Sequence, residues 1–289
     1  MAAKKTALNS LNAEPAELRE RLQTALESDQ LDLPPLPEVA TQMVSSSATQ
    51  QQSAAALSQL IQRDPALAGH VMRVANSAAY QPRAPIVSLQ QAIAWLGISE
   101  IRNIALAVSV HGEVFVAPGH EPEIQELWRE SLATACWARE LARLKKRNVV
   151  TAYLCGLLHR IGRAVAVATL SRIEVAGRRT VAARTFSALA DEFEAEFGRK
   201  LAAKWQLPAS IAEVIANWRN AGRPDAARPE VLQVYVAHLL SIEVLHPEIS
   251  NLSLLAEHGA LGELDIYPDE LETLRSKFDL VLATIANLG

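Results

Sequence analysis

Apolar residues recur at intervals of three and four along most of this chain, the spacing that places side chains on one face of an α-helix. A clear example is the series Ile124, Leu127, Trp128, Leu132, Ala135 and Cys136. Alanine and leucine, both strong helix formers, account for 49 and 39 of the 289 residues. Valine and isoleucine are scattered among them and rarely alternate with polar residues, as a half-buried strand requires. The sequence therefore predicts an all-α fold.

The class of protein is narrowed by what the chain lacks. No apolar stretch reaches the roughly 18–20 residues of a membrane-spanning helix. The first six residues, 1–6, lack the apolar run of a secretory signal. Two cysteines, Cys136 and Cys155, are too few for a disulfide framework. We therefore expect a protein of a reducing compartment, the cytoplasm, that makes no contact with a membrane.

Charge is distributed unevenly along the chain. The net charge is −4, to which residues 241–289 contribute −7 and residues 1–240 contribute +3. A nucleic-acid-binding domain usually has a strongly basic face, and a surplus of three charges over 240 residues does not supply one. Two basic clusters, at 139–147 and 172–184, are expected to be solvated helix ends and loops, because cations are favoured at helix C-termini. The charge pattern predicts no specific binding of nucleic acid.

Breaks in the helical pattern divide the chain. The segment Leu33–Pro37 contains three prolines and ends any helix that reaches it, since proline lacks a backbone donor and restricts the residue before it. The C-terminal part is acidic but too rich in leucine for a disordered tail. The predicted parts are a polar lead-in with one short helix (1–30), a folded body (31–240) made of two helical lobes (31–120 and 121–240), and an acidic helical segment against that body (241–289).

Helix ends in the first lobe carry capping residues. Asp64 before Pro65 is a typical N-cap followed by proline in the first turn. Ser88 and Gln91 have the spacing of a capping box, and Gly97 suits the left-handed residue that ends a helix. The lobe is therefore expected to consist of several short, separately capped helices.

The two helices on either side of Gly97, at 90–96 and 99–110, follow one another as in a helix-turn-helix. A DNA-reading helix has to present polar side chains to a groove. The second helix is apolar around most of its circumference and offers only Arg102 and Asn103 for that purpose. Packing in the core is therefore the favoured interpretation of this pair, and DNA reading the lesser one.

Residues that could carry chemistry form no complete motif. None of the seven histidines lies in a His-Glu-x-x-His motif, and no Cys-x-x-Cys occurs. There is no Gly-x-Ser-x-Gly elbow and no glycine-rich phosphate loop. Cys155 and His159 lie four residues apart in an apolar helix, which supplies only two ligands and favours a structural role. By themselves the residues predict no active site.

The segment Gly156–Gly162 reads Gly-Leu-Leu-His-Arg-Ile-Gly and resembles the His-Asp phosphohydrolase superfamily, whose helix carries Gly-Leu-Leu-His-Asp-Ile-Gly. The chain also resembles the HDOD family, the HD-related output domain, over about residues 31–240. This resemblance implies an all-helical fold, with an N-terminal lobe packed on a degenerate HD-type bundle, and a role in bacterial signal transduction. The segments that carry it, in the family's order, are Leu33–Pro37, Asp64–Leu67, Val74–Tyr80, Leu89–Gly97 and Ile101–Leu106.

The chain departs from the superfamily at the metal ligands. Active members hold metal with an early His, the His-Asp pair and a late Asp, and the motifs place these at Glu130, at His159 with Arg160, and at His238. A guanidinium has no acceptor and stays charged, so Arg160 cannot ligate a cation and would repel one. We expect Glu130 to pair with Arg160 there. The resemblance therefore implies a vestigial site without metal, cofactor or catalytic residues.

The leading hypothesis is a non-catalytic signalling or scaffolding module that binds signalling proteins or a small anionic ligand. Glu130, His159, Arg160 and His238 form the candidate pocket, where Arg160 could meet a phosphate or carboxylate. Pairing of Arg160 with a neighbouring side chain is its simpler role. Two alternatives remain: a metal-dependent phosphohydrolase that uses Glu130, His159 and His238, and a DNA-binding regulator that acts through residues 90–110.

Overall fold

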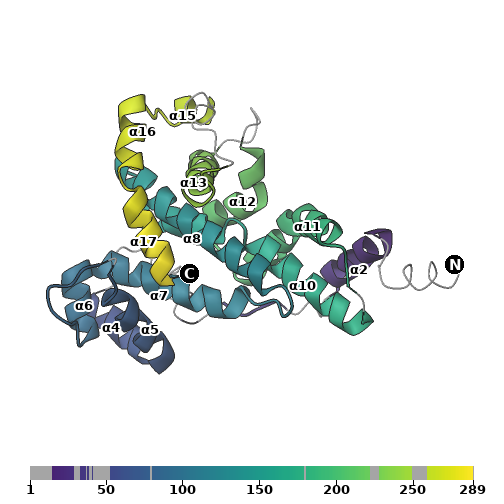
Figure 1. Ribbon diagram of the computed structural model, residues 1–289, viewed down its shortest axis with the longest axis horizontal. Coiled ribbons are helices and arrows are strands. Elements are labelled where there is room, and N and C mark those ends of the chain that lie inside the picture. Colours follow the sequence, from purple (N-terminus) through teal and green to yellow (C-terminus); the bar gives the residue numbers. More distant parts are fainter. Residues whose placement is uncertain are drawn as a thin grey trace, which may run out of the picture.

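The computed structural model describes residues 15–28, 33–36, 38, 41, 53–78, 80–178, 180–221, 228–248 and 259–288. All regular structure in these residues is helical, with no strand, which confirms the predicted all-α fold (Figure 1). In chain order the helices are α2 (Pro15–Glu27), α4 (Ala54–Gln62), α5 (Pro65–Ala75), α6 (Leu89–Leu96), α7 (Ile98–Val114), α8 (Glu121–Leu144), α9 (Val149–Leu158), α10 (Ile161–Gly177), α11 (Ala183–Lys204), α12 (Ala209–Asn217), the 3₁₀ helix η1 (Trp218–Asn220), α13 (Pro229–Leu245), α15 (Gly259–Glu263), α16 (Pro268–Arg275) and α17 (Phe278–Leu288).

Helices α4 to α7 pack together at one end of the molecule (Figure 1). The start of α5 is capped as predicted: Asp64 Oδ1 accepts from the backbone N–H groups of Ala66 and Leu67 at 2.9 and 3.0 Å. These bonds satisfy donors that the first turn of a helix leaves free. Buried residues on the inner faces, such as Leu57 and Val71, then join the helices into one core.

The corner between α6 and α7 depends on Gly97. The two helices meet at 118°. Gly97 has φ 86° and ψ 156°, a backbone conformation that residues other than glycine rarely adopt. Ser88 caps α6 by accepting from Gln91 N at 3.2 Å. The predicted capping box is only half formed, because Gln91 Oε1 accepts from Val87 N instead of Ser88 N.

Helix α7 is a core helix. Its side chains are buried along most of its length, and Arg102 and Asn103, the two residues suited to reading DNA, are 9% and 3% exposed. A side chain buried in this way does not reach a DNA groove. The burial supports core packing as the role of the α6–α7 pair.

Helix α8 runs through the centre of the second lobe, where it packs against α9 and α13 (Figure 1). Helices α10 and α11 lie side by side and form the neighbouring layer. The aromatic side chains along α11 belong to the core, since Phe186, Phe193 and Phe197 are at most 4% exposed. One buried apolar cluster continues from this lobe into the first.

Helix α2 does not belong to the first lobe, although it precedes it in sequence. It packs on α10 and α11, at the opposite end of the molecule from α4 to α6 (Figure 1). Leu18 and Leu22 are buried there, and Arg19 pairs with Glu192 at 2.6 Å. The described part of the lead-in is thus a packed helix of the second lobe.

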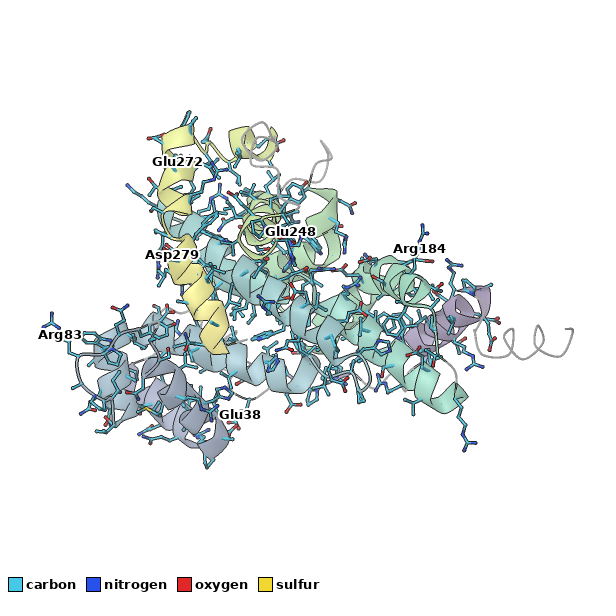
Figure 2. The ribbon with its side chains drawn as sticks, viewed as in Figure 1. Glu38, Arg83, Arg184, Glu248, Glu272 and Asp279 are labelled. Carbon is cyan, nitrogen blue, oxygen red and sulfur yellow. The ribbon has the colours of Figure 1, made fainter. Side chains whose placement is uncertain are left out.

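The described residues of the C-terminal segment form helices α15, α16 and α17, which pack against the body. Helix α17 packs on α8, and Trp128 Nε1 donates to Leu288 O at 2.9 Å. Lys145 pairs with Glu270 at 2.7 Å and so attaches α16 to the end of α8. Glu272 on α16 and Asp279 on α17 remain exposed on the outer side (Figure 2). Residues 249–258 of this segment lie outside the described residues.

The expectation that the basic cluster at 139–147 is solvated is wrong for Arg139, whereas Arg143 and Lys146 are exposed. Arg139, in the cluster expected to be solvated, is 4% exposed, and its Nη1 donates to Glu100 of α7 at 2.6 Å. Tyr80 OH donates to the same carboxylate at 2.7 Å. Burial of the arginine is tolerated because a charged partner from the first lobe meets it. This contact therefore joins α8 to the first lobe.

No single helix among the described residues is both long enough and apolar enough to cross a membrane.

Candidate functional site

The four predicted site residues come from four places in the second lobe and meet at one cavity. Glu130 lies on α8, His159 ends α9, Arg160 precedes α10 and His238 lies on α13. Glu130, Arg160 and His238 line a cavity of about 560 Å³, and His159 lies behind His238. Arg160 Nη1 donates to Glu130 Oε2, so the expected ion pair is present.

His159 and His238 form a neutral pair on the cavity wall. His159 Nδ1 donates to Gly156 O at 2.7 Å, and its Nε2 lies 3.4 Å from His238 Nδ1. Burial, with the positive charge of Arg160 as a further cause, holds the pKa of His159 well below its usual value and lowers that of His238 to about 3. Neither imidazole carries a charge at neutral pH.

Trp218, from η1, contacts both histidines of this pair. Its ring lies 4.8 Å from that of His159 and 4.6 Å from that of His238, both edge to face. The guanidinium of Arg219 lies over the same ring, 4.8 Å from its centroid. Trp218 therefore fixes the two histidines on one side and Arg219 on the other.

The sequence did not indicate a functional role for seven further residues of the site: Glu123, Glu126, Arg163, Asp191, Glu194, Trp218 and Arg219. Two are acids three residues apart on α11, so they share one face, as Arg160 and Arg163 do around the start of α10. The spacing of these charged residues is the feature of the sequence that could have indicated the site. Helical periodicity detects the apolar stripe of α11, and Glu194, 2% exposed, lies at the edge of this buried face.

The donors with metal-ligand geometry differ from the set expected for a hydrolase. Within the described residues, Glu126, Glu130 and His246 place one ligand atom each within 4.8 Å of one another. Glu126 Oε1 lies 3.0 Å from His246 Nε2. His159 and His238 are not part of this group. The expected set of Glu130, His159 and His238 is therefore close in space but does not converge as a metal site.

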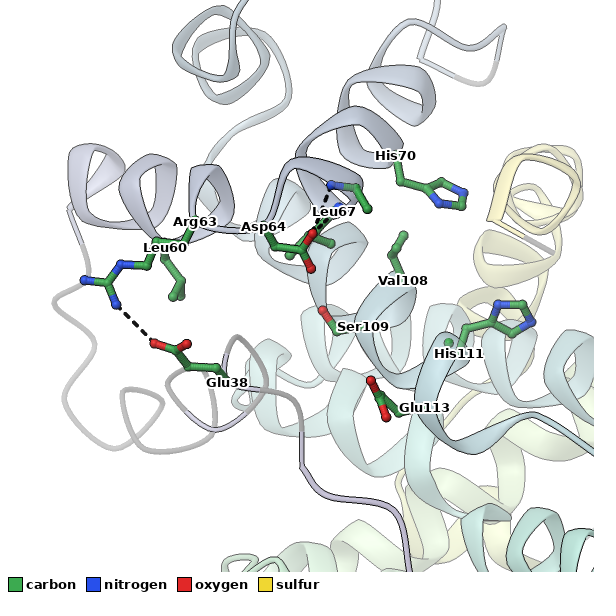
Figure 3. Close-up of a pocket in the computed structure, with 12 residues that line it drawn as sticks. Glu38, Leu60, Arg63, Asp64, Leu67, His70, Val108, Ser109, His111 and Glu113 are labelled. Carbon is green, nitrogen blue, oxygen red and sulfur yellow. Dashed lines mark hydrogen bonds and ion pairs between the residues drawn. The ribbon is translucent and has the colours of Figure 1, made fainter.

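A second cavity, of about 410 Å³, lies in the first lobe between α5 and α7 (Figure 3). His70 and His111 face it from one side, and burial lowers the pKa of both. Asp64 is occupied in capping α5, and Arg63 pairs with Glu38 at 3.1 Å. Asp64, Arg63 and Glu38 of this cavity thus have partners in the chain, unlike Nε of Arg160 beside the larger one.

The sequence matches the model of the HDOD domain over residues 33–221. An uncharacterised protein of Treponema pallidum is 25% identical over 189 residues, which is 62% of this chain and 36% of that protein. The chain therefore spans just over a third of the length of this curated relative.

Solved structures share the fold. A protein of Shewanella amazonensis, provisionally named a metal-dependent phosphohydrolase, is 22% identical with a TM-score of 0.69, covering 95% of this chain and 99% of that one. A protein of Marinobacter aquaeolei, provisionally named a signal transduction protein, is 20% identical with a TM-score of 0.68, covering 96% and 67%. With the match to the family model over most of its length, the chain belongs to the HDOD family.

Proposed function

We propose that this chain is a module of bacterial signal transduction that acts by binding, without hydrolysis, and that its binding site is the cavity at Arg160. The ion pair between Arg160 and Glu130 carries the proposal, because it occupies two positions where the superfamily places metal ligands. Membership of the HDOD family and the name of the Marinobacter protein support the signalling role.

The donor set does not fit the superfamily's metal centre. Arg160 adds a permanent positive charge, and a divalent cation about 5 Å away would be opposed by several kcal/mol at an effective dielectric near 20. One oxygen of Glu130 is committed to Arg160. His159 donates from Nδ1 to Gly156 O, and its other nitrogen faces His238 instead of the cavity centre.

Metal content and hydrolysis test the proposal together. Purified wild-type protein is expected to hold no stoichiometric metal and to leave a simple phosphodiester uncleaved with added Mn²⁺, Fe²⁺ or Zn²⁺. The triple variant Glu130→His, Arg160→Asp and His238→Asp restores the superfamily's ligand types and is expected to gain bound metal. Stoichiometric metal with turnover in the wild-type protein would overturn the proposal.

A metal-dependent phosphohydrolase is the second candidate. It is favoured by the convergence of Glu126, Glu130 and His246, whose carboxylate and imidazole ligands suit zinc or manganese, and by the name of the Shewanella protein. This candidate predicts that His246→Ala removes metal and turnover together. Wild-type protein without either counts against it.

A further inference from the structure

Three arginines converge on a single carboxylate oxygen in the cavity. Arg219 Nη2 lies 2.8 Å from Asp191 Oδ1, and Arg160 Nη2 lies 3.7 Å from the same atom. Arg163 Nη1 also donates to Asp191 Oδ1. The arginines belong to the start of α10 and to η1, and Asp191 belongs to α11. One oxygen with three cationic neighbours marks the position of strongest attraction for an anion in this cavity.

Each arginine is held in place by a second carboxylate. Glu130 accepts from Arg160, Glu123 accepts from Arg163 Nη2 at 2.7 Å, and Glu194 accepts from Arg219 Nε at 2.9 Å. The Glu194 side chain is 3% exposed, whereas that of Asp191 is 44% exposed. These three glutamates therefore hold the three guanidinium groups in place. Asp191 is the more exposed carboxylate and is free to turn toward solvent.

Asp191 satisfies Arg163 and Arg219 but not Arg160. Arg160 is 9% exposed, and its Nη2 lies 3.7 Å from Asp191 Oδ1, beyond ordinary hydrogen-bond length. Its Nε is buried without a hydrogen-bond partner and lies 3.6 Å from Glu194 Oε1. A larger anion in the place of Asp191 would reach Arg160 Nη2 and make the hydrogen bond that Asp191 leaves unmade.

We infer that Asp191 holds the place of a phosphate group, and that a small phosphate-bearing ligand binds the cavity by displacing it from Arg160, Arg163 and Arg219. This inference rests on the proposed binding function of the cavity. A carboxylate ligand would bring no more charge than Asp191 itself. A phosphate dianion brings a second charge and three oxygens, which matches three guanidinium groups in number and geometry.

The acidic residues around the three arginines make the replacement of Asp191 by a phosphate selective. Glu123, Glu130 and Glu194, the second carboxylate partners of the three arginines, offset the arginines' charge, so an anion that leaves Asp191 in place meets repulsion. An anion can therefore bind only when Asp191 moves away from the arginines. The Asp191 carboxylate lowers the affinity of the cavity for anions, and a phosphate binds by competing for its position.

Titration with inorganic phosphate tests this. In Asp191→Asn the competing charge is gone while the shape is kept, and phosphate is expected to bind about tenfold more tightly than to the wild-type protein. Glu192→Gln is the matched control: it removes the same charge one residue away, where Glu192 pairs with Arg19 outside the cavity, and should leave phosphate affinity unchanged. Equal affinity in Asp191→Asn and wild type, or an equal gain in Glu192→Gln, overturns the inference.

A measurement on the wild-type background guards against misfolding of the Asp191 variant. Millimolar phosphate is expected to raise the melting temperature of the wild-type protein more than chloride at equal ionic strength, and Arg219→Gln is expected to lose the difference. Absence of this difference in the wild type overturns the inference. If phosphate fails either test and the protein is free of metal and inactive, the proposed non-hydrolytic function still stands. Metal-dependent turnover would rule out that function, whatever the phosphate measurements show.

Discussion

Glu130 and Arg160 are each mostly buried, with side chains 14% and 11% exposed, and each is the other's nearest charged partner. Glu130→Ala would leave Arg160 in the cavity with only Asp191 and Glu194, at 3.7 and 3.6 Å. We expect the free energy of unfolding at pH 7 to fall by about 2–4 kcal/mol, because a buried charge loses its closest partner. Urea denaturation measures this change.

Glu20→Ala is the control for this substitution, since Glu20 is an exposed helical carboxylate on α2. Its effect should stay within about 0.5 kcal/mol. Equal stability of Glu130→Ala and wild type would mean that Asp191 and Glu194 already satisfy Arg160 and that the pair contributes nothing.

At the scale of residues, the sequence predicted the pair but not its surroundings. Glu130 and Arg160 could be matched because the motif placed opposite charges at two positions that meet in the superfamily. Asp191 and Arg219 belong to no such motif. They reach Arg160 only because α11 crosses beside α10 and because η1 follows α12, and the apolar periodicity that predicts each helix does not fix such crossings.

Helices α10 and α11 approach more closely than most side chains would permit, and glycines make this possible. A Cβ at Gly162 would lie 2.6 Å from Gly198 N and 2.8 Å from Gly198 Cα, as well as against Glu194 O. Real Cβ atoms essentially never come this near to backbone. The position of Asp191 and Glu194 on α11 relative to Arg160 therefore depends on the absence of a side chain at Gly162.

Gly162→Ala is expected to destabilise the protein by about 3 kcal/mol, because the new methyl group has to push α11 away from α10. Gly69→Ala provides the contrast: Gly69 lies within α5, and a Cβ there meets nothing within 4 Å. That substitution should stabilise by about 0.5–1 kcal/mol through helix propensity. Thermal denaturation of both variants checks the two signs, and a neutral Gly162→Ala would contradict this account of the contact.

At the scale of elements, local chemistry predicted where helices begin and end but not where each one docks. The caps Asp64 and Ser88 and the corner at Gly97 act within a few residues, and all three occur. The docking of α2 joins Arg19 to Glu192, and beyond α2 Trp205 donates to Pro34 O, contacts that are each more than 170 residues apart in sequence. Amphipathic spacing shows that a helix has a buried face without identifying its partner.

At the scale of the whole molecule, stability should depend on pH through histidines that are buried in the neutral form. The pKa of His238 is about 3 in the folded protein against an ordinary histidine value of 6.5, and that of His159 is also strongly lowered, in both cases chiefly by burial. Below about pH 6.5 the unfolded chain binds protons that the folded chain does not. The free energy of unfolding therefore falls as the pH is lowered from 6.5, by up to about 1.4 kcal/mol per pH unit for each such histidine.

His70 and His111 have lowered pKa values as well and contribute in the same direction, so one substitution is needed to isolate the cavity. His238→Asn removes one proton uptake and is expected to reduce the slope of unfolding free energy against pH, between pH 6.5 and 5, by about 1 kcal/mol per pH unit. The slope separates this effect from any uniform loss of stability that the substitution causes. Urea denaturation across that range measures it, and parallel curves for variant and wild type would show that His238 is not held neutral in the folded protein.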